Sequence, residues 1–187
     1  MQPPAYDAVV LAGGSSSRFG GDKLAAVVDG TPLLDRALAA TAGASRRIVV
    51  GEARAVAVDV QWTRERPAGG GPAAAVVAGL ELVTAPWVVL LAGDLPYVGP
   101  QTIGRLIAAA PGHEGAVLVD ASGRRQTLCS VVAADALRVR AAGRTDWHGA
   151  ALRALLAGLR LTEVPARAAE AHDIDVPGDL DRLQEEP

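Results

Sequence analysis

Residues 9–24 combine flexible backbone, hydroxyl groups and cationic side chains directly after an apolar run. The stretch reads VVLAGGSSSRFGGDKL. Glycines let a ligand approach the backbone, consecutive N–H groups bind anions, and lysine and arginine add positive charge. Together these residue types suit a triphosphate. The residues that could contribute are Gly13, Gly14, Ser15, Ser16, Arg18 and Lys23.

This loop matches neither of the two familiar nucleotide-binding motifs. Lys23 follows Asp22 rather than a glycine, which excludes a Walker A loop, and the adjacent glycines exclude GxGxxG. A flexible, solvated connection after the first strand is the alternative interpretation. The combination of Arg18 and Lys23 with a buried strand just before them favours a phosphate-binding loop.

A second candidate is Asp94 in the segment LLAGDLP, where an apolar run meets a loop. A carboxylate in this position is a hard oxygen ligand of the kind that holds Mg²⁺ shared with substrate phosphates. An aspartate that caps the turn at Leu95 and Pro96 is the alternative. Beside a triphosphate-binding loop, the metal interpretation is favoured.

Two further loops carry weaker signals. Gly69–Gly71 and Pro72 would lead into a helix N-terminus, which favours negative charge, or would simply form a tight helix entry. Near the end of the chain, Asp173 and Asp175 alternate about Ile174. On an extended segment both carboxylates would face one way and suit a shared metal, although an acidic surface turn is the alternative.

The remaining polar residues give weaker evidence of a functional role. The segment SGRRQTL places Arg124 and Arg125 in a predicted turn, where they would hold an acceptor phosphate or be solvated. His113 and His148 have no partner at metal-ligand spacing, which argues against a zinc site. Cys129 lies inside an apolar run and is predicted to be buried rather than nucleophilic.

The composition narrows the class of protein. With 187 residues, half of them hydrophobic, the chain is expected to form a single domain over residues 1–187. A net charge of −3 without a run of lysine or arginine argues against nucleic acid as a partner. No segment has the length and apolarity of a membrane span and no secretory signal is visible, so we expect a cytoplasmic protein without membrane attachment. We expect a monomer or a weak oligomer.

Short apolar runs alternate with helical stretches along the chain. The predicted strands span residues 8–12, 46–51, 56–62, 86–94, 115–120, 127–134 and 159–165. The predicted helices span 31–43, with Thr31 as N-cap, and 71–85, 100–110, 133–142 and 148–159. Continuous apolar strands separated by helices predict an α/β fold whose mostly parallel central sheet has helices on both faces. Ligands of such sheets gather at the carboxyl ends of the strands, where the loops described above lie.

With these loops in order, the chain resembles the molybdenum cofactor guanylyltransferase family of nucleotidyltransferases. The family signature LAGGxSxRxGxDK is matched by Leu11–Gly14, Ser16, Arg18, Gly20, Asp22 and Lys23. The family segments GxGP, DxP, GRxQ and xIxxPxDL are matched within residues 69–72, 94–96, 123–126 and 173–180. The matches keep the family order and cover nearly the whole chain.

The resemblance implies a Rossmann-like nucleotidyltransferase fold, an Mg²⁺-dependent site, and transfer of GMP from GTP to molybdopterin with release of pyrophosphate. Arg18 and Lys23 would neutralise the leaving pyrophosphate, and Asp94 would hold the metal. We take Asp175 as a second metal ligand. The implied acceptor contacts are Arg124, Gln126 and Asp173. The implied nucleotide contacts are Leu11, Ala12, Gly13, Gly14, Ser15, Ser16, Lys23, Glu65, Gly71, Pro72 and Asp94.

Some positions depart from the family pattern. Asp173 and Asp175 stand where guanylyltransferases carry asparagines, and this form is more like related cytidylyltransferases. In the family an acid usually precedes the GxGP loop at about the position of Arg64, and Glu65 is the nearest acid in this chain. Thr127 stands where the family usually has a proline. The nucleotide stays open between GTP and CTP, and the acceptor between molybdopterin and another phosphorylated small molecule. A non-catalytic nucleotide sensor is a further alternative, which Lys23 and Asp94 together disfavour.

Overall fold

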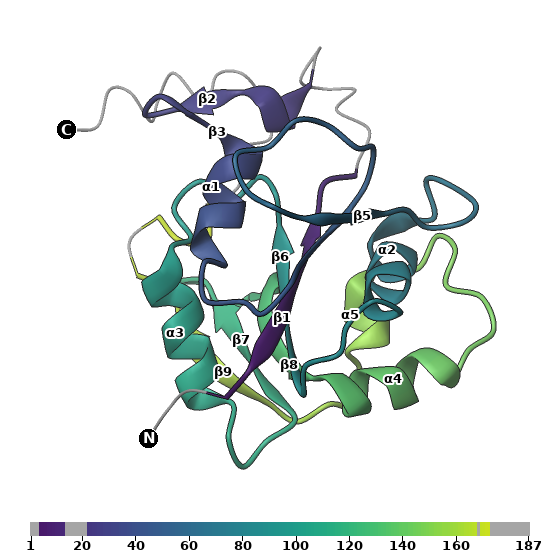
Figure 1. Cartoon of the computed structure of the whole chain (residues 1–187). Coiled ribbons are helices and arrows are strands. Elements are labelled where there is room, and N and C mark those ends of the chain that lie inside the picture. The colour runs from purple at the N-terminus through teal and green to yellow at the C-terminus, as the bar shows by residue number, and fades with distance from the viewer. Residues whose placement is uncertain (1–3, 14–21, 168, 173–187) are drawn as a thin grey trace.

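A seven-stranded sheet forms the centre of the computed structural model, which describes residues 4–13, 22–167 and 169–172 (Figure 1). The strand order is β5-β4-β1-β6-β8-β7-β9. The pairs β5–β4, β4–β1, β1–β6 and β7–β9 are parallel, whereas β8 is antiparallel to β6 and β7. The predicted mostly parallel sheet is therefore confirmed, with one reversed strand inside it. The strands are β1 (Tyr6–Leu11), β4 (Arg47–Val50), β5 (Gln61–Thr63), β6 (Trp87–Ala92), β7 (Gly115–Val119), β8 (Arg125–Ala133) and β9 (Leu161–Pro165).

Helices cover both faces of the sheet, as predicted. The side chains of β1 alternate between the faces: Val10 packs in one apolar cluster with α1 and α3, and Val9 packs in a second cluster with α2, α4 and α5. All six residues of β1 are buried, which explains why its sequence is continuously apolar apart from Asp7. The helices are α1 (Leu33–Ala40), α2 (Gly71–Leu80), α3 (Pro100–Ala109), α4 (Ala134–Ala142) and α5 (Leu152–Leu155) (Figure 1).

The residues before α1 differ from the prediction. Val27–Val28 (β2) and Thr31–Pro32 (β3) form a small antiparallel hairpin, so Thr31 is a strand residue and not a helix cap. The two turn residues Asp29 and Gly30 have φ angles of 49° and 76°. Positive φ at both central positions is the type I′ geometry that an Asp-Gly pair readily adopts.

Several other elements are shorter than predicted. The predicted strand 56–62 is reduced to β5, since β4 offers partners only to residues 61–63. The predicted helix 148–159 is reduced to α5, because Gly149 and Gly158 have φ angles of 71° and 80°. The predicted helix 31–43 ends at Ala40, and the predicted helix 71–85 ends at Leu80.

A charged cluster holds the segment after β9 against α3. Glu170 accepts hydrogen bonds from both terminal nitrogens of Arg105, at 2.9 and 2.6 Å, and from the Thr102 hydroxyl at 2.7 Å. It also accepts one from the Arg167 backbone N–H at 2.7 Å. Burial by itself would raise the pKa of Glu170, but these hydrogen bonds outweigh burial and lower its pKa to about 2. Glu170 is therefore ionised at neutral pH.

Gly79 lies where α2 meets the sheet, and a Cβ there would be 2.6 Å from Val9 Cγ1 and 3.0 Å from Val50 Cγ2. Because the core is close-packed, Gly79→Ala should lower the free energy of unfolding by about 1–3 kcal/mol. Gly104 in α3 is the matched control, since a Cβ there meets nothing within 4 Å. Gly104→Ala should raise the free energy of unfolding by about 0.5–1 kcal/mol. Urea unfolding checks both variants, and equal effects would contradict the packing explanation.

Glu170→Gln should lower the free energy of unfolding at pH 7 by roughly 3 kcal/mol, because the folded pKa lies well below the ordinary value. A lowered folded pKa gives stability that is complete above the unfolded pKa of 4.5 and is lost as pH falls towards about 2. The difference between wild type and variant should therefore shrink between pH 5 and pH 3. Glu163→Gln, from a half-exposed pair with Arg125, should cost less than about 1 kcal/mol. A pH-independent effect of Glu170→Gln in urea titrations would contradict this assignment.

Candidate functional site

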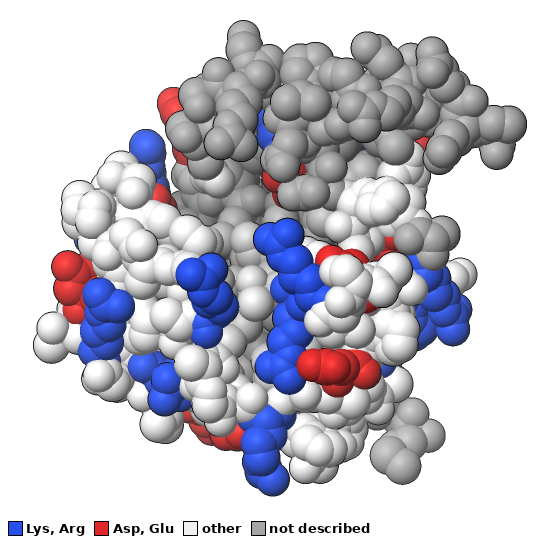
Figure 2. Space-filling model, turned by 180° about the vertical axis from the view of Figure 1, so that it is seen from behind, with Lys and Arg blue, Asp and Glu red and all other residues white. Residues whose placement is uncertain are grey.

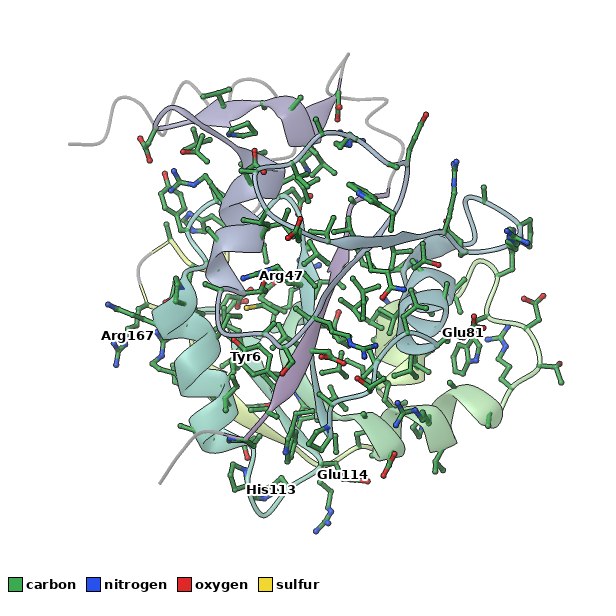
Figure 3. The ribbon with its side chains drawn as sticks, in the orientation of Figure 1. Tyr6, Arg47, Glu81, His113, Glu114 and Arg167 are labelled. Carbon is green, nitrogen blue, oxygen red and sulfur yellow. The ribbon has the colours of Figure 1, made fainter. Side chains whose placement is uncertain are left out.

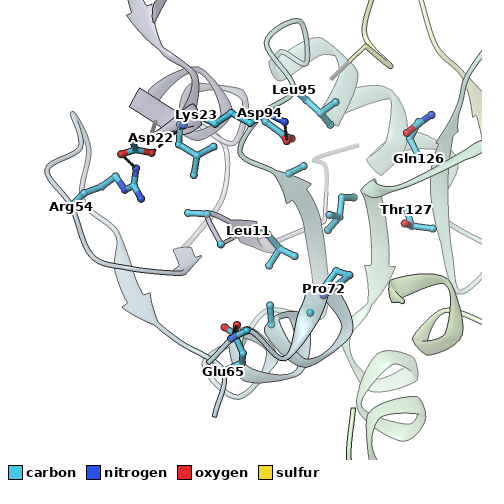
Figure 4. Close-up of a pocket in the computed structure, with 18 of the residues that line it drawn as sticks. Leu11, Asp22, Lys23, Arg54, Glu65, Pro72, Asp94, Leu95, Gln126 and Thr127 are labelled. Atoms are coloured by element: carbon cyan, nitrogen blue, oxygen red, sulfur yellow. Dashed lines mark hydrogen bonds and ion pairs between the residues drawn. The ribbon is translucent and has the colours of Figure 1, made fainter. Parts of the chain in front are cut away.

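A cavity of about 720 Å³ opens at the edge of the sheet where β1 and β6 have their carboxyl ends (Figure 4). Its other walls come from the loops after β4 and β5, the start of α2 and the first residues of β8. Because β8 is antiparallel to β6, its beginning lies at the same edge as the end of β6. The cavity brings together ten of the predicted site residues: Leu11, Ala12, Gly13, Lys23, Glu65, Gly71, Pro72, Asp94, Arg124 and Gln126.

Six predicted site residues lie outside the described residues. They are Gly14, Ser15, Ser16, Arg18, Asp173 and Asp175. Their roles stay predictions. The described residues on either side of the first gap, Gly13 and Asp22, both line the cavity.

Lys23 and Asp94 form an ion pair inside the cavity (Figure 4). The distance from Lys23 Nζ to Asp94 Oδ2 is 2.8 Å, and the two side chains are only 13% and 27% exposed. Lys23 begins the short helix η1 (Lys23–Ala25), where the Asp22 side chain accepts a hydrogen bond from the Leu24 backbone N–H. Two of the three residues predicted to act in catalysis, Lys23 and Asp94, are therefore direct neighbours although they are distant in the sequence.

The loop that carries Asp94 is held from two sides. The Gly93 backbone N–H donates to the Leu11 carbonyl at 3.0 Å, which joins this loop to the end of β1. Arg36 Nε on α1 donates to the Pro96 carbonyl at 2.9 Å, and Arg36 Nη1 donates to the Val28 carbonyl in the hairpin at 3.0 Å. Sequence reasoning missed Arg36, because a helix interior carries no ligand-loop signal.

Charged residues that the sequence analysis did not select line the cavity beside Glu65. Arg54, in the loop after β4, forms an ion pair with Asp22 and holds the pKa of that carboxyl below its usual range (Figure 4). Glu65 Oε1 accepts a hydrogen bond from the Gly69 backbone N–H at 3.0 Å and so shapes the glycine-rich loop. The position of Arg54 after a predicted strand was the signal that could have drawn attention to it.

The opposite wall of the cavity is a turn organised by Asp120. Its Oδ1 accepts hydrogen bonds from the backbone N–H groups of Ser122 and Arg124, at 2.9 and 3.0 Å. Its Oδ2 accepts one from Gln126 Nε2 at 2.9 Å. The Ser122 hydroxyl, as the largest cause, and these further hydrogen bonds lower the pKa of Asp120. Asp120, which the sequence analysis did not select, thus positions Arg124 and Gln126, two of the three residues predicted to bind the acceptor.

The glycine-rich loop before α2 is supported by a distant segment. The Gly149 N–H donates to the Gly70 carbonyl at 2.8 Å. Trp147, which is buried, donates from Nε1 to the Ala141 carbonyl at 2.9 Å and so ties this segment to α4. The start of α2 therefore meets the cavity with its loop conformation supported by hydrogen bonds, and no motif in the sequence signals this support.

Two residues with reactive side chains, Cys129 and His113, are not among those that line the cavity. Cys129 is completely buried, and burial raises the pKa of its thiol to about 12, which confirms the prediction that it is a core residue. His113 lies just before β7, at the edge of the sheet opposite the cavity (Figure 3).

Two kinds of feature are absent from the part of the chain that the structure describes. Within residues 4–13, 22–167 and 169–172, no three His, Cys, Asp or Glu side chains gather into a metal-binding group. Asp94 is one of the carboxylates that line the cavity, and Mg²⁺ commonly binds to one or two carboxylates and completes its shell with phosphates and water. No helix among the described residues has the length and apolarity needed to cross a membrane.

The charges of the cavity nearly balance. Among the described residues, the cavity is lined by four basic ones, Lys23, Arg54, Arg124 and Arg125, and by three acidic ones, Asp22, Glu65 and Asp94. Outside the cavity, basic side chains are spread over the face seen from behind, with acidic ones between them (Figure 2). The cavity itself therefore offers cations for phosphate together with a carboxylate for a metal.

Comparisons with known proteins agree with this arrangement. The MobA-like NTP transferase domain matches residues 8–169. A probable molybdenum cofactor guanylyltransferase of Bacillus cereus (strain B4264) is 30% identical over 131 residues, which are 66% of each chain. The alignment thus spans slightly less than two thirds of that relative.

Solved structures share the fold at lower identity. Molybdopterin-guanine dinucleotide biosynthesis protein A from Archaeoglobus fulgidus superposes with a TM-score of 0.69 at 19% identity, over 96% of this chain and 97% of that one. The 2-C-methyl-D-erythritol 4-phosphate cytidylyltransferase from Thermus thermophilus superposes with a TM-score of 0.70 at 20% identity, over 98% of both chains. The domain match covers most of the residues that line the cavity and most of the chain, and we conclude that this chain belongs to the MobA-like NTP transferase family.

Proposed function

We propose that this chain is a nucleotidyltransferase that moves GMP from GTP to molybdopterin and releases pyrophosphate. The observation that carries the proposal is the contact between Lys23 and Asp94 in a cavity whose opposite wall presents Arg124 and Gln126. The name of the Bacillus cereus relative supports this choice of nucleotide and acceptor. We also propose that this biosynthetic reaction takes place in the cytoplasm.

In the proposed reaction, a phosphate oxygen of the acceptor attacks the α-phosphorus of the nucleotide. A new P–O bond forms, the bond from the α-phosphorus to the bridging oxygen of the β-phosphate breaks, and pyrophosphate leaves with the electron pair. Such chemistry depends on positioning and on neutralising charge. Lys23, with Arg18 from outside the described residues, would neutralise the β- and γ-phosphates.

Asp94 would hold Mg²⁺, which supplies charge neutralisation at the α-phosphate when bound. The donor set fits, because Asp94 is a partly exposed carboxylate next to Lys23 in the cavity and would leave most of the coordination shell to phosphates and water. Asp175, also outside the described residues, is proposed as a second ligand.

The remaining contacts divide between the two substrates. Backbone groups from Leu11 to Gly13 and the loop at Gly71 and Pro72 would hold the nucleotide, and Glu65 would accept hydrogen bonds from its base. Gly14, Ser15 and Ser16 extend this nucleotide-binding set beyond the described residues. At the other wall, Arg124 and Gln126, with Asp173, would bind the acceptor. CTP is the second candidate nucleotide, because Asp173 and Asp175 follow the pattern that resembles cytidylyltransferases.

A nucleotide panel tests the proposed reaction. With Mg²⁺ and molybdopterin, the chain should release pyrophosphate from GTP at least about tenfold faster than from CTP or ATP, as expected when a site pairs its polar groups with one base. Reactions without acceptor are the control. A faster reaction with CTP would make the chain a cytidylyltransferase. Nucleotide binding without pyrophosphate release from any acceptor tried would indicate a sensor.

Substitutions test the two central residues. Lys23→Ala and Asp94→Ala should each lower the rate of pyrophosphate release by about 100-fold or more, as found when a charge-stabilising group is removed. Their urea unfolding transitions should stay cooperative. Arg153→Ala, at an exposed position on α5 away from the cavity, is the control and should keep wild-type activity. Wild-type turnover by Lys23→Ala would refute the assigned role of Lys23.

A further inference from the structure

We propose that Lys23 occupies the metal-binding carboxylate of Asp94 in the absence of substrate, so that the divalent cation and the triphosphate bind cooperatively. This inference rests on the proposed function, because it assumes that Asp94 binds the metal and Lys23 binds phosphate.

The pair is not a solvated surface ion pair. Its 2.8 Å separation and its side-chain exposures of 13% and 27% mean that water screens it only partly. Removing one partner of such a pair leaves the other charge poorly solvated, which is costly. Any ligand that takes Lys23 or Asp94 must therefore compensate the partner that it leaves behind.

The other acids that line the cavity among the described residues are already engaged. Asp22 is paired with Arg54, and Glu65 accepts the Gly69 N–H. A divalent cation that entered alone would compete with Lys23 for Asp94 and would come to lie beside a second cation. At contact distances and a protein-like dielectric, such repulsion amounts to several kcal/mol. Metal binding without nucleotide should consequently be weak.

A triphosphate that entered alone meets the opposite problem. Its oxygens would attract Lys23, but the Asp94 carboxylate would then face the phosphates without a counter-charge. When both ligands arrive, Lys23 pairs with phosphate oxygens, Asp94 pairs with the metal, and each charge keeps a partner. Each ligand thus strengthens the binding of the other, and this coupling is reciprocal.

The surroundings allow this exchange by moving one side chain. Asp94 lies on a loop held by the hydrogen bonds from Gly93 to Leu11 and from Arg36 to Pro96. Lys23 carries its ammonium group on a flexible four-carbon stem, and the hydrogen bond from Leu24 to Asp22 holds its backbone. The lysine side chain can therefore swing between Asp94 and a phosphate while the carboxylate stays in place.

Mn²⁺ binding, measured by electron paramagnetic resonance on the full chain, tests the exchange without an activity assay. In the absence of nucleotide, Lys23→Met should bind Mn²⁺ at least about fivefold more tightly than wild type, the lower end of typical coupling between sites. Lys23→Arg, which keeps the charge, should bind like wild type. Arg124→Met, which removes one charge from the opposite wall, should have a smaller effect than Lys23→Met. Addition of GTP should tighten Mn²⁺ binding to wild type more than to Lys23→Met.

The reciprocal measurement does not depend on a stable Lys23 variant. In EDTA, Asp94→Asn should bind GTP at least about fivefold more tightly than wild type, because the phosphates no longer face a carboxylate. No gain in GTP affinity for Asp94→Asn would overturn the inference, as would equal Mn²⁺ affinities of wild type and Lys23→Met.

The double variant Lys23→Met with Asp94→Asn distinguishes a failure of the proposed exchange from a failure of the metal-binding role of Asp94. Loss of Mn²⁺ binding in the double variant, together with equal affinities of wild type and Lys23→Met, refutes only the exchange and leaves Asp94 as the metal ligand. Undiminished Mn²⁺ binding in the double variant places the metal elsewhere and refutes both the exchange and the metal-binding role in the proposed function.

Discussion

The parallel pairing of β1 with both β4 and β6 is the constraint on which the arrangement of the cavity depends. The register places Leu11 beside Val50 on one side and beside Ala92 on the other, so three strands end at one edge. Asp7, fully buried at the start of β1, accepts hydrogen bonds from the backbone N–H groups of Thr84 and Ala85 before β6. Because a shifted register would break these bonds and disrupt the close packing of side chains on both buried faces, the edge that carries the loops is strongly specified.

At this edge of the sheet, basic and acidic side chains neutralise each other in pairs. Lys23 with Asp94, and Arg54 with Asp22, pair groups that are distant in the sequence. Such pairs are weak evidence for stability when they are partly buried, since desolvation offsets attraction. In the proposed function their value would lie in binding, because a polyanion and a cation could exchange with existing partners without leaving an isolated charge. The proposed triphosphate site, made of paired charges, would thus stay compatible with a folded, ligand-free protein.

The two walls of the cavity have different origins. The wall with Arg54 and Glu65 follows parallel strands, whereas the wall with Arg124 and Gln126 comes from the turn before the reversed strand β8 and from its first residues. The same fold occurs in proteins named for guanine and for cytidine chemistry. A choice of base must then come from a few side chains and loops, such as the Glu65–Gly69 turn, and not from the architecture.

Local chemistry in the sequence predicted β1, β6 and α3, because continuous apolar runs and helical spacing are properties of neighbouring residues. It also predicted that Lys23, Asp94, Gly71 and Gln126 belong to ligand loops, which the cavity brings together. The sequence predicts a helix that begins with Thr31 as its N-cap, whereas Thr31 pairs in a hairpin whose turn is Asp29–Gly30. The reversal of β8 and the contacts of Arg54, Arg36 and Asp120 were not readable from the sequence, since each depends on how the chain pairs and folds around them. The sequence alone thus determined which residues could bind a triphosphate, a metal and an acceptor. Only the tertiary structure decided that Lys23 meets Asp94, because strand register and loop hydrogen bonds are non-local.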